Sequence, residues 1–147
     1  MTKDVLVTIA GLQFEVDSEE PIEVITAGQY FCKNEKHYIL YEEILEDMKA
    51  VCKNRIKISS DMVEILKTGA SNVHMVFEVG KKNLTYYNTP FGNLLIGIDT
   101  TKIVCNESED VIELNIEYGL EVNYSHVSEC SITVKAATKK SKIKENR

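Results

Sequence analysis

The sequence lacks the features that mark several large classes of protein. Its 147 residues include no tryptophan, two prolines and seven glycines, too little proline and glycine for a linker-rich or collagen-like chain. No window approaches the ~18 consecutive apolar residues that a membrane-spanning helix needs, and the first residues do not form the apolar core of a signal peptide. We therefore expect a globular chain that resides in the cytoplasm, without a membrane partner.

Arginine is nearly absent, since Arg55 is the only one before the final residue. Residues 135–147 carry a net charge of +5, which leaves −11 on residues 1–134. A body of that charge repels phosphate backbones, and so few guanidinium groups leave almost no bidentate donors for bases. The composition thus argues against a nucleic-acid partner. We expect a single domain over residues 1–137, followed by a flexible basic tail over residues 138–147.

Recognisable catalytic and metal-binding motifs are also missing. The three histidines include no pair at i and i+2, and the four cysteines include no Cys-x-x-Cys pair. There is no Gly-x-Ser-x-Gly elbow, no phosphate-binding glycine loop and no His-Glu-x-x-His. We expect the cysteines to stay reduced as small buried hydrophobes. We predict no metal and no cofactor, and an enzyme is the least supported class of function because no nucleophile and base are paired in a known motif.

Apolar residues alternate with polar residues along most of the chain, which is typical of half-buried β-strands. The longest run spans residues 112–124, and a second clear run spans residues 73–79. Short connections between the runs leave no room for crossover helices, so the strands are predicted to be antiparallel. We predict an all-β fold of about 8–10 strands that closes into one barrel, because closure removes exposed strand edges.

Turns and bends are predicted at polar and glycine-containing positions. Asn34-Glu35 is a hairpin turn, and Gly28 and Gly119 interrupt long strands where a bend is expected. Residues 42–53 are ambiguous, because their apolar spacing is helical whereas residues 53–59 alternate as a strand. Both a short helix and a loop near residues 43–50 are compatible with this pattern.

Several short motifs follow one another along the chain. They are Val7, Ile9, Gly11 and Gln13, Thr26 to Tyr30, Tyr38 to Glu43, Phe77, Glu78 and Gly80, Tyr87 to Gly92, and Glu117-Tyr118. In this order and spacing they resemble the motifs of the YwiB-like family, a bacterial domain of unknown function with a lipocalin-like, calycin-type β-barrel. The resemblance covers residues 5 to about 137 and implies a fold rather than an activity. It also favours strand–loop–strand over helix for residues 42–59, and it marks Lys67 as a departure, since relatives often have arginine there.

Lys67 is the first residue of a candidate ligand-binding group at one rim of the predicted barrel. It shares parity with Val63 and Ile65, so its side chain is expected to point inward. An inward ammonium needs a carboxylate partner or a mouth open to water. We predict a pair with Glu43, with Glu42 as the other possible partner, which would orient the polar head group of a ligand. The alternative is a lysine solvated beside Gly69.

Tyrosines are the second source of candidate ligand contacts. Tyrosines at a barrel mouth stack on a ligand or donate hydrogen bonds to it, although they are equally good packing residues in strands. Tyr41 and Tyr87 complete the candidate group with Glu43 and Lys67. His74 opposes the apolar parity of its strand and is therefore expected to face solvent.

Two functions of different classes fit these observations. The first is a barrel without catalysis that binds or senses a small hydrophobic or amphipathic molecule. The second is a protein-interaction module, a homodimer for example, that uses an outer sheet face. Ile22 with Ile25, and Leu94 with Leu95, place apolar groups on both faces of their strands, so one face has to be covered.

Overall fold

The computed structural model describes residues 3–11, 23–45, 50–69, 72–89 and 92–138. Within those ranges the chain forms ten β-strands and no helix, as predicted for an all-β fold. The strands are β1 (Lys3–Ala10), β2 (Glu23–Lys33), β3 (Lys36–Leu45), β4 (Ala50–Ile58), β5 (Met62–Gly69), β6 (Val73–Glu78), β7 (Lys82–Thr89), β8 (Gly92–Glu107), β9 (Val111–Val122) and β10 (Ser125–Thr138).

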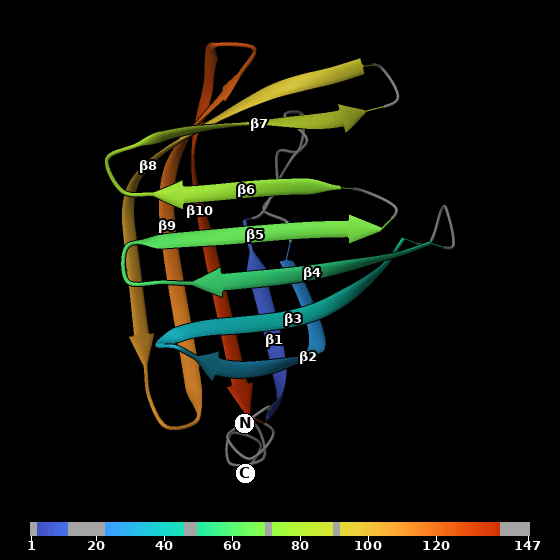
Figure 1. Cartoon of the computed structure of the whole chain (residues 1–147), viewed down its shortest axis with the longest axis vertical. Coiled ribbons are helices and arrows are strands. Elements are labelled where there is room, and N and C mark those ends of the chain that lie inside the picture. The colour runs from blue at the N-terminus through green and yellow to red at the C-terminus, as the bar shows by residue number, and fades with distance from the viewer. Residues whose placement is uncertain (1–2, 12–22, 46–49, 70–71, 90–91, 139–147) are drawn as a thin grey trace.

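The strands form one antiparallel sheet that curls into a nearly closed barrel (Figure 1). Their order across the sheet is β6-β5-β4-β3-β2-β1-β10-β9-β8-β7, so only the pairing of β1 with β10 joins distant parts of the chain. The two edge strands, β6 and β7, lie near each other without a hydrogen-bonded ladder between them. The predicted barrel of about 8–10 strands is therefore confirmed, with a seam between β6 and β7.

Strand β2 passes from one layer of the barrel to the other. In Figure 1 its first half runs beside β1 and its second half runs beside β3, which crosses the direction of β1. The register agrees, because β1 pairs with β2 up to Tyr30 whereas β3 pairs with β2 only from Gly28 onward. A Cβ at Gly28 would lie 2.5 Å from the carbonyl oxygen of Leu40. Only glycine allows this close approach, as the predicted bend requires.

Strand β8 is the second strand that passes from one layer of the barrel to the other. It pairs with β7 as far as Asp99 and with β9 from Ile96 to Glu107. A register shift between Thr100 and Lys102 marks a β-bulge, which bends a strand and increases its twist. Gly119, the other position where a bend is predicted, lies opposite Asp99 beside this bulge.

Large side chains fill the interior of the barrel. The rings of Phe77 and Tyr118 meet edge to face at 5.1 Å between centroids, and both residues are fully buried. Isoleucines from β3, β4, β5, β8, β9 and β10 surround them. The interior is therefore a packed core along much of its length, as in other barrels of this strand number.

Two local predictions are corrected by the structure. Residues 43–45 and residue 50 belong to β3 and β4, so a helix over residues 43–50 is wrong for these positions, and residues 46–49 lie outside the described residues. Pairing of Glu43 with Cys52 explains the outcome, since a sheet ladder satisfies the same backbone groups that a helix would. The run over residues 112–124 stops at Val122, because Asn123 and Tyr124 adopt positive φ angles of 50° and 69° in a turn.

Other expectations have mixed outcomes. The Asn34-Glu35 turn is confirmed, with φ angles of 52° and 66° that are typical of a type I′ hairpin. Of the four free cysteines, only Cys52 is buried, so the prediction of buried cysteines is wrong for the exposed Cys32 and Cys105. Strand β10 extends through Thr138, and the remainder of the predicted tail lies outside the described residues. The described ranges contain no helix long and apolar enough to cross a membrane.

Candidate functional site

Three neighbouring strands bring polar side chains together inside one end of the barrel. Tyr41 on β3 lies opposite Asn54 on β4, which in turn lies opposite Lys67 on β5. These positions continue the inward-facing rows that contain Ile39, Ile56 and Ile65 in the core. Glu43 follows Tyr41 by two residues and therefore points to the same face.

Glu43 is the centre of this group. Its Oε1 atom lies 2.9 Å from Nζ of Lys67 and accepts a hydrogen bond of 3.0 Å from Nδ2 of Asn54. Both charged side chains are largely removed from solvent, with 23% of Glu43 and 15% of Lys67 exposed. The predicted pairing of Glu43 with Lys67 is thus present, and the ammonium charge is balanced where water is scarce. Glu42, the other predicted partner, is exposed.

Asn54 contributes an unsatisfied acceptor to the same group. The residue is 2% exposed, and its Oδ1 atom has no hydrogen-bond partner. A buried carbonyl oxygen without a partner costs about 1–3 kcal/mol, so native proteins rarely leave one unoccupied without reason. Asn54 lies opposite Lys67 on the neighbouring strand, and its other polar atom, Nδ2, donates to Glu43, so the group is a polar recess rather than a completed network.

Burial and charge keep the phenol of Tyr41 protonated. Desolvation is the larger cause and the nearby carboxylate of Glu43 adds to it, so the pKa of Tyr41 lies well above its usual range. Tyr41 is 5% exposed, and its phenol remains a hydrogen-bond donor at all physiological pH values.

The structure thus unites three of the four predicted residues. Tyr87 lies on β7, which pairs only with β8, and its half-buried ring packs against the core. Asn54 was not among the predicted residues, although the residues on either side of it indicate that it faces inward. Lys53 and Arg55 alternate outward on β4, so the residue between them has to face inward, where an amide is unusual.

A second polar group occupies the opposite end of the barrel. The hydroxyl of Tyr30 lies 2.6 Å from Nδ1 of His37, and Nε2 of His37 lies 3.2 Å from Oε2 of Glu107. The rings of Tyr30 and His37 also stack, with centroids 5.8 Å apart. Desolvation, followed by the charges of Cys32 and Glu107, raises the pKa of Tyr30 to about 12. Sequence spacing gave no indication of this group, because Glu107 lies on a strand far from the β2–β3 hairpin.

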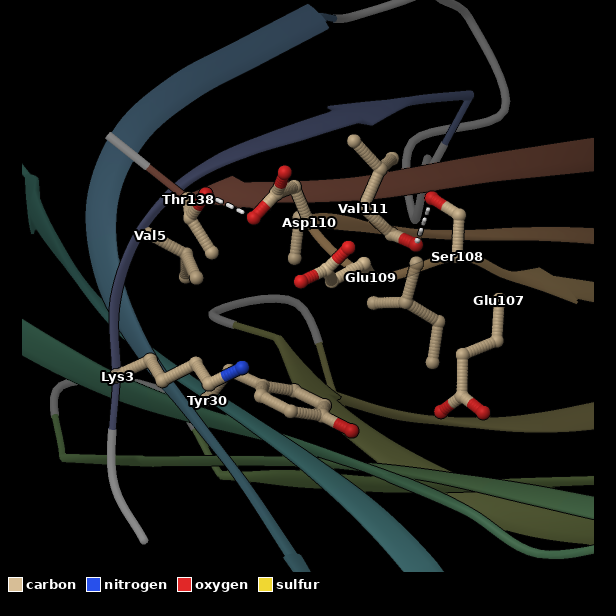
Figure 2. A pocket seen from close by; sticks show the side chains of 11 residues that line it. Lys3, Val5, Tyr30, Glu107, Ser108, Glu109, Asp110, Val111 and Thr138 are labelled. Atoms are coloured by element: carbon tan, nitrogen blue, oxygen red, sulfur yellow. Dashed lines mark hydrogen bonds between the residues drawn. The ribbon is translucent and has the colours of Figure 1, made fainter. Parts of the chain in front are cut away.

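A small cavity adjoins this second group. Figure 2 shows Lys3 and Tyr30 facing Glu109 and Asp110 across it, with the hydroxyl of Thr138 hydrogen-bonded to Asp110 at 3.3 Å. Its volume of about 130 Å³ is room for a few water molecules. Pockets for organic ligands are several times larger, so this cavity is not a candidate ligand site.

The part of the chain that the structure describes contains no cluster of side chains typical of a metal site. No group of three or more His, Cys, Asp or Glu side chains is placed there to hold a metal ion. His74 is exposed, as predicted, and Nε2 of its ring lies 3.3 Å from Glu64 on the outer face. The polar recess of Glu43, Asn54 and Lys67 therefore remains the best-supported site.

Comparison with known proteins agrees with this architecture. The chain is similar to the uncharacterised β-barrel protein YwiB of Bacillus subtilis (strain 168), with 28% identity over 123 residues, which cover 82% of this chain and 85% of that protein. The crystal structure of the ywiB protein from Bacillus subtilis superposes with a TM-score of 0.76 at 22% identity and covers 93% of this chain and 92% of that one.

The family model matches across most of the barrel. The model described as Domain of unknown function (DUF1934) matches residues 7–134, from the first strand into the last. The resemblance to the YwiB-like family is thereby confirmed. The chain belongs to the DUF1934 family of β-barrel domains of unknown function.

Proposed function

We propose that this barrel binds a small molecule and recognises its polar head group with Glu43, Asn54 and Lys67. The unsatisfied Oδ1 atom of buried Asn54 is the observation that carries the proposal. A head group that donates a hydrogen bond to this atom removes the cost of leaving it unpaired. The barrel would then act as a lipocalin-like carrier or sensor, without catalysis.

The charge balance of the recess restricts the head group. Lys67 and Glu43 neutralise each other at 2.9 Å, so the recess offers no net charge to an anion or to a cation. It still offers hydrogen-bond acceptors on Asn54 and Glu43. A neutral head group that donates hydrogen bonds, such as a carboxamide or a hydroxyl, fits best.

Packing restricts where the ligand lies. Phe77 and Tyr118 occupy the middle of the barrel, so a long apolar tail does not thread through the interior. The ligand is therefore held near the end where Glu43 and Lys67 lie.

Native mass spectrometry of the gently purified protein tests the proposal. We expect a retained small molecule on the wild type and its loss from the Glu43→Gln and Lys67→Met variants. Glu64→Gln is a matched control, since Glu64 is also 23% exposed and pairs with a lysine, Lys57, but on the outer face. A wild-type protein that never carries an adduct would contradict the proposal, as would an adduct equally retained by all variants.

Exposed apolar side chains favour a second candidate function, an interaction through an outer face. Leu84 and Tyr86 on β7 are 52% and 67% exposed, and Ile25 on β2 is 59% exposed. Leu95 lies opposite Tyr86 and extends the apolar surface of β7, whereas Leu94 packs toward the core. Ile22 lies outside the described residues. Such a surface is suited to a second copy of the chain or to another protein.

Sedimentation analysis at increasing concentration tests this second candidate. A homodimer that uses the outer face of β7 should dissociate when Tyr86 is replaced by Ser, while Tyr87→Phe, on the opposite face, should leave it intact. A wild-type protein that stays monomeric at high concentration would count against homodimerisation.

A further inference from the structure

The outer face of β2 to β5 carries a groove whose lining includes neither Glu43 nor Lys67, although Tyr41 and Asn54 contribute to it. Its volume is about 760 Å³, and it begins where β2 bends at Gly28. The outward side chains of β3, β4 and β5 line it in rows across the strands, and one row contains Leu40, Arg55 and Leu66. The strand that bears Asn54 on its inner face therefore bears Arg55 on its outer face.

Two cations without a charge partner lie in this groove. Among the described residues, neither Lys53 nor Arg55 takes part in an ion pair, although both are exposed. Lys57, the next outward cation on β4, differs because it contacts Glu64 at 3.7 Å. Since residues 1–134 carry a net charge of −11 and Arg55 is their only arginine, two uncompensated cations in one concave surface are unusual for this protein.

Apolar surface flanks the guanidinium. Leu40 and Leu66 lie directly opposite Arg55 on the two neighbouring strands, and both side chains are half-buried. Glu42 lies opposite Lys53 and is the one carboxylate that lines the groove among the described residues. With Lys53, Arg55 and Glu42, the groove has a net charge of +1.

We propose that this groove binds a small amphipathic monoanion, a carboxylate on an apolar chain. The carboxylate lies between Lys53 and Arg55, where a guanidinium forms bidentate hydrogen bonds, and the chain packs on Leu40 and Leu66. A singly charged anion matches the net charge of +1, whereas a doubly charged phosphate monoester meets repulsion from Glu42. The volume is within the range of sites for single organic ligands and is small for a folded partner.

Titration of the isotope-labelled protein with octanoate, followed by amide chemical shifts in NMR, tests this inference. We expect saturable shifts on residues of β2 to β5 that surround Arg55. Octanol has the same chain without the charge, and it should bind at least about tenfold more weakly because it lacks the charge-assisted hydrogen bonds. Octylammonium should produce no saturable shifts there.

Variants distinguish binding in this groove from binding in the inward recess. Arg55→Gln and Lys53→Gln should each weaken octanoate binding several-fold, and Leu66→Ser should weaken octanoate and octanol alike. Lys102→Gln, which removes an exposed cation on β8, should change nothing. Equal affinity for octanol and octanoate, shifts centred on Glu43 and Lys67, or no saturation would each overturn the inference. The Glu43→Gln variant should bind octanoate like the wild type, so failure of the recess and failure of the groove are distinguishable.

Discussion

At the scale of single residues, the chemistry of the barrel depends on which polar groups face inward. Glu43 satisfies Lys67 and one atom of Asn54, while the other polar atom of Asn54 stays unpaired. Parity along β5 was sufficient to predict an inward lysine and its carboxylate partner. The amide of Asn54 acquires its importance only from its neighbours on β3 and β5, because opposite positions on adjacent strands contact each other.

Truncation of Glu43 should destabilise the protein more than truncation of a similar carboxylate on the outer face. Glu43→Ala leaves Lys67 and the Nδ2 atom of Asn54 without their shared acceptor, which should lower the free energy of unfolding by about 1–3 kcal/mol. Glu64→Ala removes a longer ion pair, 3.7 Å from Lys57 on the outer face, and should cost less than about 1 kcal/mol. Urea unfolding measures both values, and equal losses would contradict a special role for the contacts of Glu43 with Lys67 and Asn54.

Buried phenols should make the fold sensitive to alkaline pH. Burial raises the pKa of Tyr30 to about 12 and raises those of Tyr41 and Tyr118 further. In the unfolded chain these phenols ionise near pH 10, so above that pH the unfolded state binds fewer protons than the folded state. Stability should therefore be fully present below about pH 10 and should fall between about pH 10 and 12.

Thermal unfolding at a series of alkaline pH values measures this loss. The Tyr30→Phe variant should lose less stability than the wild type across the interval, because one phenol no longer ionises in the unfolded chain. Tyr86→Phe is the control, since this tyrosine is exposed and its replacement should leave the pH dependence unchanged. A wild-type stability that is constant up to pH 12 would contradict the assignment.

At the scale of strands and turns, positive φ angles and close approaches decide where glycine is required. Gly28 lies at the bend of β2, where a Cβ would meet Leu40 at 2.5 Å and Val7 at 2.7 Å. Gly80 instead has a positive φ of 81°, and nothing lies within 4 Å of a Cβ placed there. The two glycines are therefore required for different reasons, one for space and one for backbone conformation.

Alanine substitutions should separate these two reasons. Gly28→Ala forces the backbone of β3 away and should cost about 2 kcal/mol or more. Gly80→Ala meets only the strain of a left-handed conformation and should cost about 1 kcal/mol. Chemical denaturation gives both values, and a Gly28→Ala variant as stable as the wild type would show that the bend tolerates a side chain.

The β2–β3 turn should accept a stabilising change. Asn34 and Glu35 occupy a type I′ turn, but Glu35 holds a φ of 66° that glycine adopts without strain. Glu35→Gly should raise the free energy of unfolding by about 0.5–1 kcal/mol, because the relief of strain exceeds the added freedom of the unfolded chain. Lys36→Gly, one residue later in β3, should destabilise, and a melting temperature that falls for both variants would refute the turn assignment.

At the scale of the whole molecule, one packed interior holds the two crossing layers together. Phe77 from β6 and Tyr118 from β9 meet in this interior although they belong to opposite sides of the seam. Since no hydrogen-bonded ladder joins β6 to β7, side-chain contacts close the barrel there. The stability of the closed form should therefore depend strongly on these rings.

Removal of the Phe77 ring should destabilise the protein more than most other single substitutions. Phe77→Ala should lower the free energy of unfolding by about 3–5 kcal/mol, through lost burial and the cavity that remains. Tyr86→Ala removes an aromatic ring of similar size that is 67% exposed, and it should cost less than about 1 kcal/mol. Calorimetry compares the two, and a mild effect of Phe77→Ala would show that the interior is not the main support of the barrel.

The sequence by itself determined that the fold is all-β, antiparallel and barrel-like. Alternation with period two assigns each side chain to one face, and this local property requires no knowledge of distant residues. The same property predicted the inward Lys67, the cost of an unpaired ammonium predicted Glu43 or Glu42 as its partner, and the glycine itself predicted the bend at Gly28. Helical spacing of apolar residues was misleading for residues 43–45 and 50, which pair across strands instead.

Only the tertiary structure decided which distant side chains meet. The Tyr30, His37 and Glu107 group joins a hairpin to the end of β8, and the groove around Arg55 exists because three strands align their outward residues. Contacts of this kind depend on register and on the curvature of the sheet, which arise from the packing of all strands together. A pattern along one strand cannot encode them, because the partner lies on another strand.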